Sequence, residues 1–295
     1  MKIALCYSGK PCWKLSWDNR SVLESHALSL AASEDIEIHV FAHFWDADKF
    51  FYGKPEHELN NEIYKNLSNS LRNKIKIKTI FYERPKSSEF LRRLTFKDGI
   101  KREGRNPMLP KRNGKPIKNW QGSWAHNAIS MFYSLEKSIN LALELEREEG
   151  FKYDFIFRLR TDTVLLDAGK NFECPLNQCN GSKLNIAPYY WEDLLRDPLM
   201  LRWRPNRWNS FRGDESKTGC LDAIDDTFAF GNGKVMKKYA SVYSNFFNLT
   251  LKNPTCQECM LGIHVKESNL EIEKLKWIIA LINKDREPHE IQLLR

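Results

Sequence analysis

Three charged side chains follow a short apolar segment near the middle of the chain, at Arg158, Arg160 and Asp162. The aromatic and β-branched residues of 153–159 predict a strand that is buried on both faces. Buried, unpaired charge is costly, so these groups should emerge at the carboxyl end of that strand, where open α/β sheets bind ligands. Guanidinium groups suit a pyrophosphate, and a carboxylate suits a metal ion or a sugar hydroxyl. A structural ion pair at a strand end explains this segment equally well.

A second acidic pair, Asp225 and Asp226, precedes an apolar segment that ends at Gly231. At least one of these carboxylates is expected to face a cleft, where it can serve as a general base toward a sugar hydroxyl. The structural alternative is an acid at the start of a strand or a helix cap.

The turn formed by Ser8, Gly9 and Lys10 follows the first apolar segment, residues 2–7. Glycine lets backbone amides approach a phosphate, and the lysine can pair with it. The turn is neither Gly-x-Gly-x-x-Gly nor a P-loop, which argues against dinucleotide and P-loop nucleotide binding. An ordinary turn is the alternative interpretation.

Strands and helices of an α/β domain are expected to position these side chains. Residues 36–44 predict a second buried strand, which ends near His43 and Trp45. A long amphipathic helix over 123–149 leads directly into the 153–159 strand, so a largely parallel sheet within a single domain, 1–295, is expected. Further strands are predicted at 74–81, 183–189, 227–230 and within 270–282, and further helices at 22–32, 56–71, 234–247 and 256–266.

The net charge of +8 is concentrated in residues 84–118, which contain twelve Lys or Arg and three acids. Several Gly and Pro in this segment predict a long surface loop after one short helix. A basic lid over an anionic ligand is the functional interpretation, and a solvated insertion is the structural one. Nucleic-acid binding is a third option, but no recognised binding motif supports it, so no nucleic-acid partner is expected.

The composition also gives an expectation for the cellular compartment of the protein. No apolar run reaches the roughly 18 residues that span a bilayer, so no transmembrane segment is predicted. The amino-terminal apolar run is too short for a signal peptide. Seven cysteines without the even spacing of a disulfide framework favour free thiols and a cytoplasmic protein.

Taken together, the motifs resemble the nucleotide-sugar glycosyltransferases of the GT-A fold. The chain is most similar to a poorly characterised group found in bacterial polysaccharide loci and large viruses. The resemblance implies a Rossmann-like, mostly parallel sheet flanked by helices. It is carried by residues 3–11, 39–45, 131–134, 153–162 and 225–231.

The resemblance further implies a hexosyl- or pentosyltransferase of polysaccharide biosynthesis. This enzyme would move a sugar from a nucleoside diphosphate-sugar donor onto a hydroxyl of a glycan acceptor. Asp226 would be the catalytic base, with Asp225 beside it. The implied donor-binding residues are Ser8, Gly9, Lys10, His43, Trp45, Arg158, Arg160 and Asp162.

The resemblance places Asp162 in the position of the family's Asp-x-Asp metal motif. Arg160 stands where the first aspartate of that motif would be. The loss of one ligand weakens binding of a divalent cation, Mn²⁺ or Mg²⁺, and the arginines can instead neutralise the leaving diphosphate. Metal dependence is therefore open. The same arginine supports the alternative function, a non-catalytic protein that binds a nucleotide or an anionic glycan.

Overall fold

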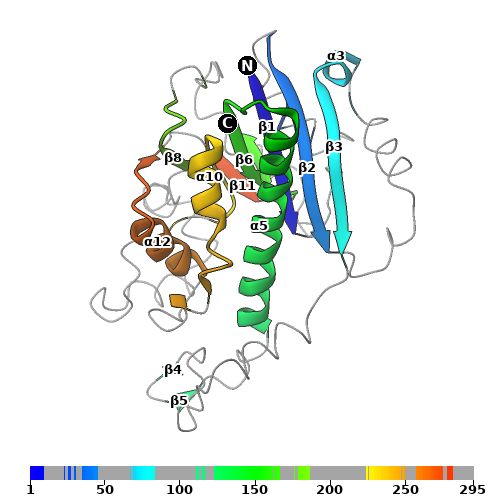
Figure 1. The fold of residues 1–295 in the computed structure, drawn as a ribbon. Helices are drawn as coiled ribbons and strands as arrows, with labels where there is room; N and C mark the ends of the chain where they lie inside the picture. Colours follow the sequence, from blue (N-terminus) through cyan, green and yellow to red (C-terminus); the bar gives the residue numbers. More distant parts are fainter. Residues whose placement is uncertain are drawn as a thin grey trace, which may run out of the picture.

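A computed structural model describes slightly less than half of the chain (Figure 1), and the structural statements below concern these residues only. Three of the predicted site residues, Lys10, Asp162 and Asp225, lie outside the described part, as does most of the basic segment 84–118. The described residues are 1–9, 23, 26–27, 30, 35–45, 67, 69–83, 111–112, 115–116, 123–161, 163–166, 176, 179–186, 224, 226–246, 248–249, 257–274 and 278–281.

A seven-stranded sheet forms the centre of the molecule, with the strand order β10-β8-β9-β6-β1-β2-β3. Every strand of this sheet runs in one direction except β9, which is antiparallel to both of its neighbours. The strands are β1 (Lys2–Gly9), β2 (Glu37–Trp45), β3 (Ile75–Glu83), β6 (Phe155–Leu159), β8 (Leu184–Ile186), β9 (Ala229–Gly231) and β10 (Ile272–Lys274).

Helices cover the two faces of the sheet. On one face α5 (Ser123–Glu149) and α10 (Gly233–Ala240) lie side by side, and they share one apolar core with that face (Figure 1). The opposite face packs against helical residues of the segment 23–30, in a second core. The predicted class, an α/β protein with a mostly parallel sheet flanked by helices, is therefore confirmed. Two further helices in the described part are α3 (Asn69–Arg72) and α12 (Gln257–Glu267).

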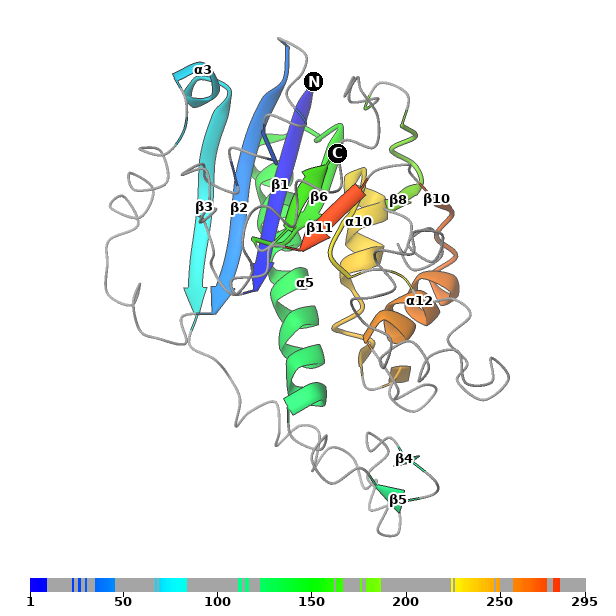
Figure 2. The same ribbon diagram turned by 180° about the vertical axis from the view of Figure 1, so that it is seen from behind.

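Two small antiparallel sheets complete the described structure. The strands β7 (Thr163–Leu166) and β11 (Ile278–Leu281) pair with each other, and β11 lies on the face opposite α5 (Figure 2). The strands β4 (Lys111–Arg112) and β5 (Lys115–Pro116) form a hairpin inside the predicted basic loop. Part of the segment predicted as a loop therefore has regular structure.

Two predicted elements differ in extent. The helix predicted over 234–247 ends at Ala240, a turn follows over 241–245, and helical structure begins again at Phe246. The apolar segment 270–282 contains two strands in different sheets, β10 and β11, where one strand was predicted. Among the described residues, no helix combines the length and hydrophobicity needed to cross a membrane.

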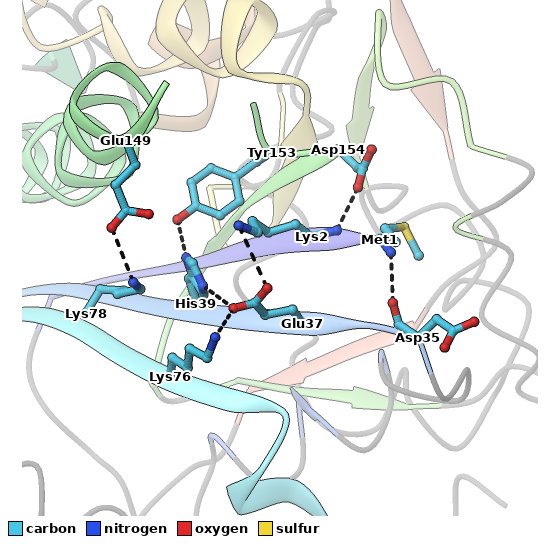
Figure 3. Close-up of polar contacts among 10 residues, drawn as sticks. All are labelled: Met1, Lys2, Asp35, Glu37, His39, Lys76, Lys78, Glu149, Tyr153 and Asp154. Atoms are coloured by element: carbon cyan, nitrogen blue, oxygen red, sulfur yellow. Dashed lines mark hydrogen bonds and ion pairs between the residues drawn. The ribbon is translucent and has the colours of Figure 1, made fainter. Parts of the chain in front are cut away.

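A polar cluster joins the amino ends of the parallel strands (Figure 3). Glu37 of β2 lies at its centre, where one carboxylate oxygen is bonded to the Lys76 ammonium and lies 2.9 Å from His39 Nε2. The Tyr153 hydroxyl lies 2.6 Å from the other ring nitrogen, His39 Nδ1. Burial lowers the pKa of His39, and its side chain is only 1% exposed. Further contacts in the cluster are Lys2 with Glu37 and Asp154, Met1 with Asp35, and Lys78 with Glu149.

This cluster makes stability depend on pH in the acid range. Hydrogen bonds from Lys76 and His39 lower the pKa of Glu37 to about 2, from an ordinary value of 4.5. A lowered carboxyl pKa contributes stability that is present above the ordinary value and is lost as the pH falls toward the folded-state value. Urea unfolding between pH 6 and 2.5 should therefore show a smaller acid-induced loss for Glu37→Gln than for the wild type. Glu144→Gln, at an exposed position on α5, should show the wild-type pH dependence.

Candidate functional site

The carboxyl ends of β1, β2 and β3 bring together three predicted site residues and two residues that were not predicted. In the parallel register, Ser8 lies beside His43, and His43 lies beside Phe81. Trp45 lies beside Glu83 in the same way. The amino-terminal turns of α5 extend past this edge of the sheet (Figure 1). Ligands of open α/β sheets bind at such an edge, so the candidate site is located here.

His43 is the centre of a hydrogen-bonded chain. Its Nδ1 lies 2.9 Å from Ser134 Oγ, and its Nε2 lies 2.9 Å from Glu83 Oε2. The Tyr133 hydroxyl donates to the same Glu83 oxygen over 3.0 Å. Burial lowers the pKa of His43, although the Glu83 carboxylate opposes that shift. The ring is 1% exposed, so His43 positions its neighbours and does not present a surface to a ligand.

Aromatic rings surround this chain. Trp45 and Tyr133 are stacked with their ring centroids 5.5 Å apart, and Tyr133 meets Tyr243 edge to face at 5.1 Å. The ring of Phe81 stacks on His43 and is itself 50% exposed. Such packing makes a rigid apolar wall at the edge of the sheet.

Ser134 joins the helix α5 to the first two strands. Its hydroxyl oxygen accepts a hydrogen bond of 3.1 Å from the Gly9 backbone amide, and it lies 2.8 Å from the His43 carbonyl oxygen. The Gly9 amide, which the sequence interpretation assigned to a phosphate, therefore has a protein partner in this structure. A phosphate contact at this turn stays a prediction, because Lys10 lies outside the described residues. Ser8 is 3% exposed, so its side chain faces the interior.

Ser134→Ala is expected to destabilise the protein by about 2 kcal/mol, because buried hydrogen-bonding groups of two strands then lack a partner. Ser138→Ala is the matched control. It lies one turn later on the same helix and is equally buried, but its hydroxyl donates only to Leu135 of that helix. Urea unfolding should show a clearly larger loss for Ser134→Ala. Equal losses for the two variants would contradict a special role for Ser134.

Arg158 is fully buried in β6. Its Nη1 donates to the Thr227 carbonyl oxygen over 3.2 Å, and its backbone pairs with Ala229 of β9. A side chain without exposed surface does not contact a ligand in this conformation. What Arg158 does contact is the segment that begins at Asp226, and it holds that segment against the sheet.

Arg160 and Asp226 are brought together, although 65 positions separate them in the sequence. Arg160 Nη1 lies 3.6 Å from Asp226 Oδ2. The Gln257 side-chain amide, at the first residue of α12, donates to the same oxygen over 3.3 Å. The turn that carries Arg160 is fixed by Thr163, whose hydroxyl donates to the Arg160 carbonyl oxygen over 2.8 Å. The Arg160 side chain is 28% exposed, whereas the Asp226 side chain is only 6% exposed.

The structure therefore arranges the described site residues in two groups. Ser8, Gly9, His43 and Trp45 lie at the ends of β1 and β2, and Arg158, Arg160 and Asp226 lie around the ends of β6 and the start of β9. Because β1 pairs with both β2 and β6, the two groups occupy the same edge of the sheet.

Sequence reasoning missed the residues that support these groups. Glu83 and Ser134 hydrogen-bond His43, Gln257 hydrogen-bonds Asp226, and Tyr133 hydrogen-bonds Glu83. A weak signal existed for two of them, since Tyr133 and Ser134 lie within one of the segments that carry the family resemblance. Glu83 had no such signal, because a glutamate at the end of an edge strand is usually a solvated residue.

A divalent cation cannot be assigned ligands from the described residues. No three His, Cys, Asp or Glu side chains gather in this part of the chain to form a metal site. Arg160, whose cationic side chain does not bind a metal ion, stands at the position that the resemblance gives to the first aspartate of the metal motif. Asp162 lies outside the described residues, so its role as a ligand stays a prediction.

No family model matches the chain, and no curated protein matches it in sequence. Solved structures match the chain when the structures are compared. The galactosyltransferase LgtC, in complex with donor and acceptor sugar analogues, has a TM-score of 0.39 and 13% identity over 90% of this chain and 70% of its own. Mouse xyloside xylosyltransferase 1 has a TM-score of 0.37 and 14% identity over 93% of this chain and 84% of its own. All these TM-scores are below 0.5, so the proposals below rest on this chain's own residues.

Proposed function

We propose that the protein is a glycosyltransferase that uses a nucleoside diphosphate-sugar donor. The observation that carries this proposal is the placement of a guanidinium and a buried carboxylate, Arg160 and Asp226, at the carboxyl edge of a parallel sheet. Group transfer from a diphosphate needs positive charge at the leaving group and a base at the incoming hydroxyl. This pair supplies both functions from neighbouring positions.

The donor would lie across the ends of β1, β2 and β6. Arg160, which is partly exposed, would bind the diphosphate with Lys10, while Arg158 would hold the segment that carries the base. Asp162 would contact the donor ribose or sugar. The wall formed by Trp45 and Tyr133 would pack against the nucleoside. Ser8, Gly9 and His43 would hold this wall in place from the ends of β1 and β2.

In the proposed reaction, an acceptor hydroxyl oxygen attacks the anomeric carbon of the donor sugar. The bond from that carbon to the diphosphate oxygen breaks, and the nucleoside diphosphate leaves with the electron pair. Asp226 takes the hydroxyl proton, and Asp225 is the neighbouring carboxylate that can assist. A single displacement of this kind inverts the anomeric configuration.

A divalent cation, Mn²⁺ or Mg²⁺, would be held by Asp162 and would neutralise diphosphate charge. Arg160 supplies positive charge in the same place, so we propose that turnover is only weakly dependent on metal. The acceptor would be a glycan of polysaccharide biosynthesis, and the enzyme would act in the cytoplasm. The basic segment 84–118 would close over the anionic donor.

The test is release of nucleoside diphosphate from a panel of nucleotide-sugars, with glycan acceptors, in the presence of Mn²⁺ or EDTA. Release from one donor would identify the activity and the sugar, and release that persists in EDTA would support the role of the arginines. Nucleotide binding without release, with any acceptor offered, would instead favour the non-catalytic nucleotide- or glycan-binding protein. Absence of both would refute the proposal.

A further inference from the structure

The ion pair between Arg160 and Asp226 joins two groups that the proposed reaction uses separately. We propose that Arg160 changes partner during the catalytic cycle: it pairs with Asp226 before the donor binds, and it moves to the diphosphate when the donor binds. This inference rests on the proposed function. It makes the base available only when the donor is in place.

The geometry of the pair permits such an exchange. The closest approach of Arg160 Nη1 to Asp226 Oδ2 is 3.6 Å, which is an ion-pair contact longer than a good hydrogen bond. The Arg160 side chain is 28% exposed, so it can turn toward an incoming anion without opening the core. A partly exposed contact of this kind is weak compared with a buried, bidentate one.

A diphosphate is the stronger partner for the guanidinium. It carries more negative charge than a single carboxylate, and its oxygens match the two-pronged donor geometry of arginine. The turn that carries Arg160 is held in place by Thr163, so the movement needs only the side chain. The diphosphate should therefore win the competition for Arg160.

Asp226 would keep its position after Arg160 leaves. The Gln257 amide donates to Asp226 Oδ2 over 3.3 Å, and Arg158 holds the adjoining Thr227 carbonyl. Gln257 is thus a positioning residue, which orients the base without touching the reacting atoms.

A double-mutant cycle tests the exchange without relying on turnover. Binding of UDP, GDP, ADP and CDP would be measured by calorimetry for the wild type, Asp226→Asn, Arg160→Gln and the double variant. Asp226→Asn should bind the preferred nucleoside diphosphate about three- to tenfold more tightly, because Arg160 no longer has a competing partner. Arg160→Gln should bind it at least about tenfold more weakly. In the Arg160→Gln background, Asp226→Asn should then have no effect on affinity.

Controls separate the exchange from general charge effects and from misfolding. Lys237→Gln removes one positive charge from an exposed position on α10 and should leave affinity unchanged. Thermal melting should show that each variant is folded. Gln257→Leu should leave nucleoside diphosphate affinity unchanged and lower kcat for transfer, a split that simple loss of structure would not produce.

The outcomes are distinguishable. Equal tightening by Asp226→Asn in both backgrounds would show a general charge effect and would overturn the exchange while leaving the proposed function intact. An unchanged affinity of Asp226→Asn would overturn it as well. If none of the four proteins binds any of the four nucleotides, the proposed function fails, and the exchange fails with it.

Discussion

Replacing Asp226 by Asn is expected to lower the rate of sugar transfer at least about 100-fold, the lower end of what a general base contributes. The amide has nearly the same shape and can still accept from Gln257, so the fold should be retained. What it loses is the ability to take the acceptor proton. The measurement is nucleoside diphosphate release at saturating donor and acceptor, once the donor has been identified.

Two aspartates serve as comparisons for this result. Asp35→Asn changes an exposed aspartate just before β2, at the opposite end of the sheet, and should retain wild-type activity. Asp225→Asn should be measured in parallel, because this residue directly precedes Asp226 and is the second candidate. Full activity of Asp226→Asn together with inactivity of Asp225→Asn would transfer the role of base to Asp225.

Replacing Gly231 by Ala is expected to destabilise the protein by about 3 kcal/mol, at the upper end of the usual cost of overpacking. A Cβ atom at Gly231 would lie 2.8 Å from Val235 Cγ1 and 2.9 Å from the Lys183 carbonyl oxygen. One of these neighbours is backbone, so the contact cannot be relieved by a side-chain rotation. Urea unfolding measured by circular dichroism would give the change in free energy.

Gly181→Ala is the matched control for Gly231→Ala. Its added Cβ would come no closer than 3.3 Å to a ring atom of Phe155 and 3.4 Å to the Asp154 carbonyl oxygen. The loss of stability should therefore be clearly smaller at Gly181. A Gly231→Ala variant as stable as the wild type would show that β9 can move away from β8 at little cost.

The strands that carry the site could be predicted with some accuracy. Residues 2–7, 36–44 and 153–159 were predicted as strands, and β1, β2 and β6 cover them closely. These strands are buried on both faces, and their apolar runs are therefore continuous and easy to recognise. The antiparallel direction of β9 was not predicted, because strand direction depends on the path of the chain between strands and leaves no pattern in a three-residue segment.

The partners of the site residues could not be predicted. Ser134 and Ser138 have the same residue type on the same helix, yet one bonds two strands and the other bonds only its own helix. Likewise, nothing local distinguishes the buried Arg158 from the partly exposed Arg160 two positions later. Their difference follows from where β6 ends, since the strand buries the first and releases the second.

The sequence by itself determined the class of the fold, the buried strands and the kinds of chemistry available at their ends. These properties follow from the periodicity of apolar residues and from the cost of burying charge, which act over a few residues. Only the tertiary structure decided that Arg160 meets Asp226, that Gln257 orients this carboxylate, and that Ser134 takes the Gly9 amide. Those contacts join residues far apart in the chain, and their distances depend on strand order and helix placement, which no local pattern records.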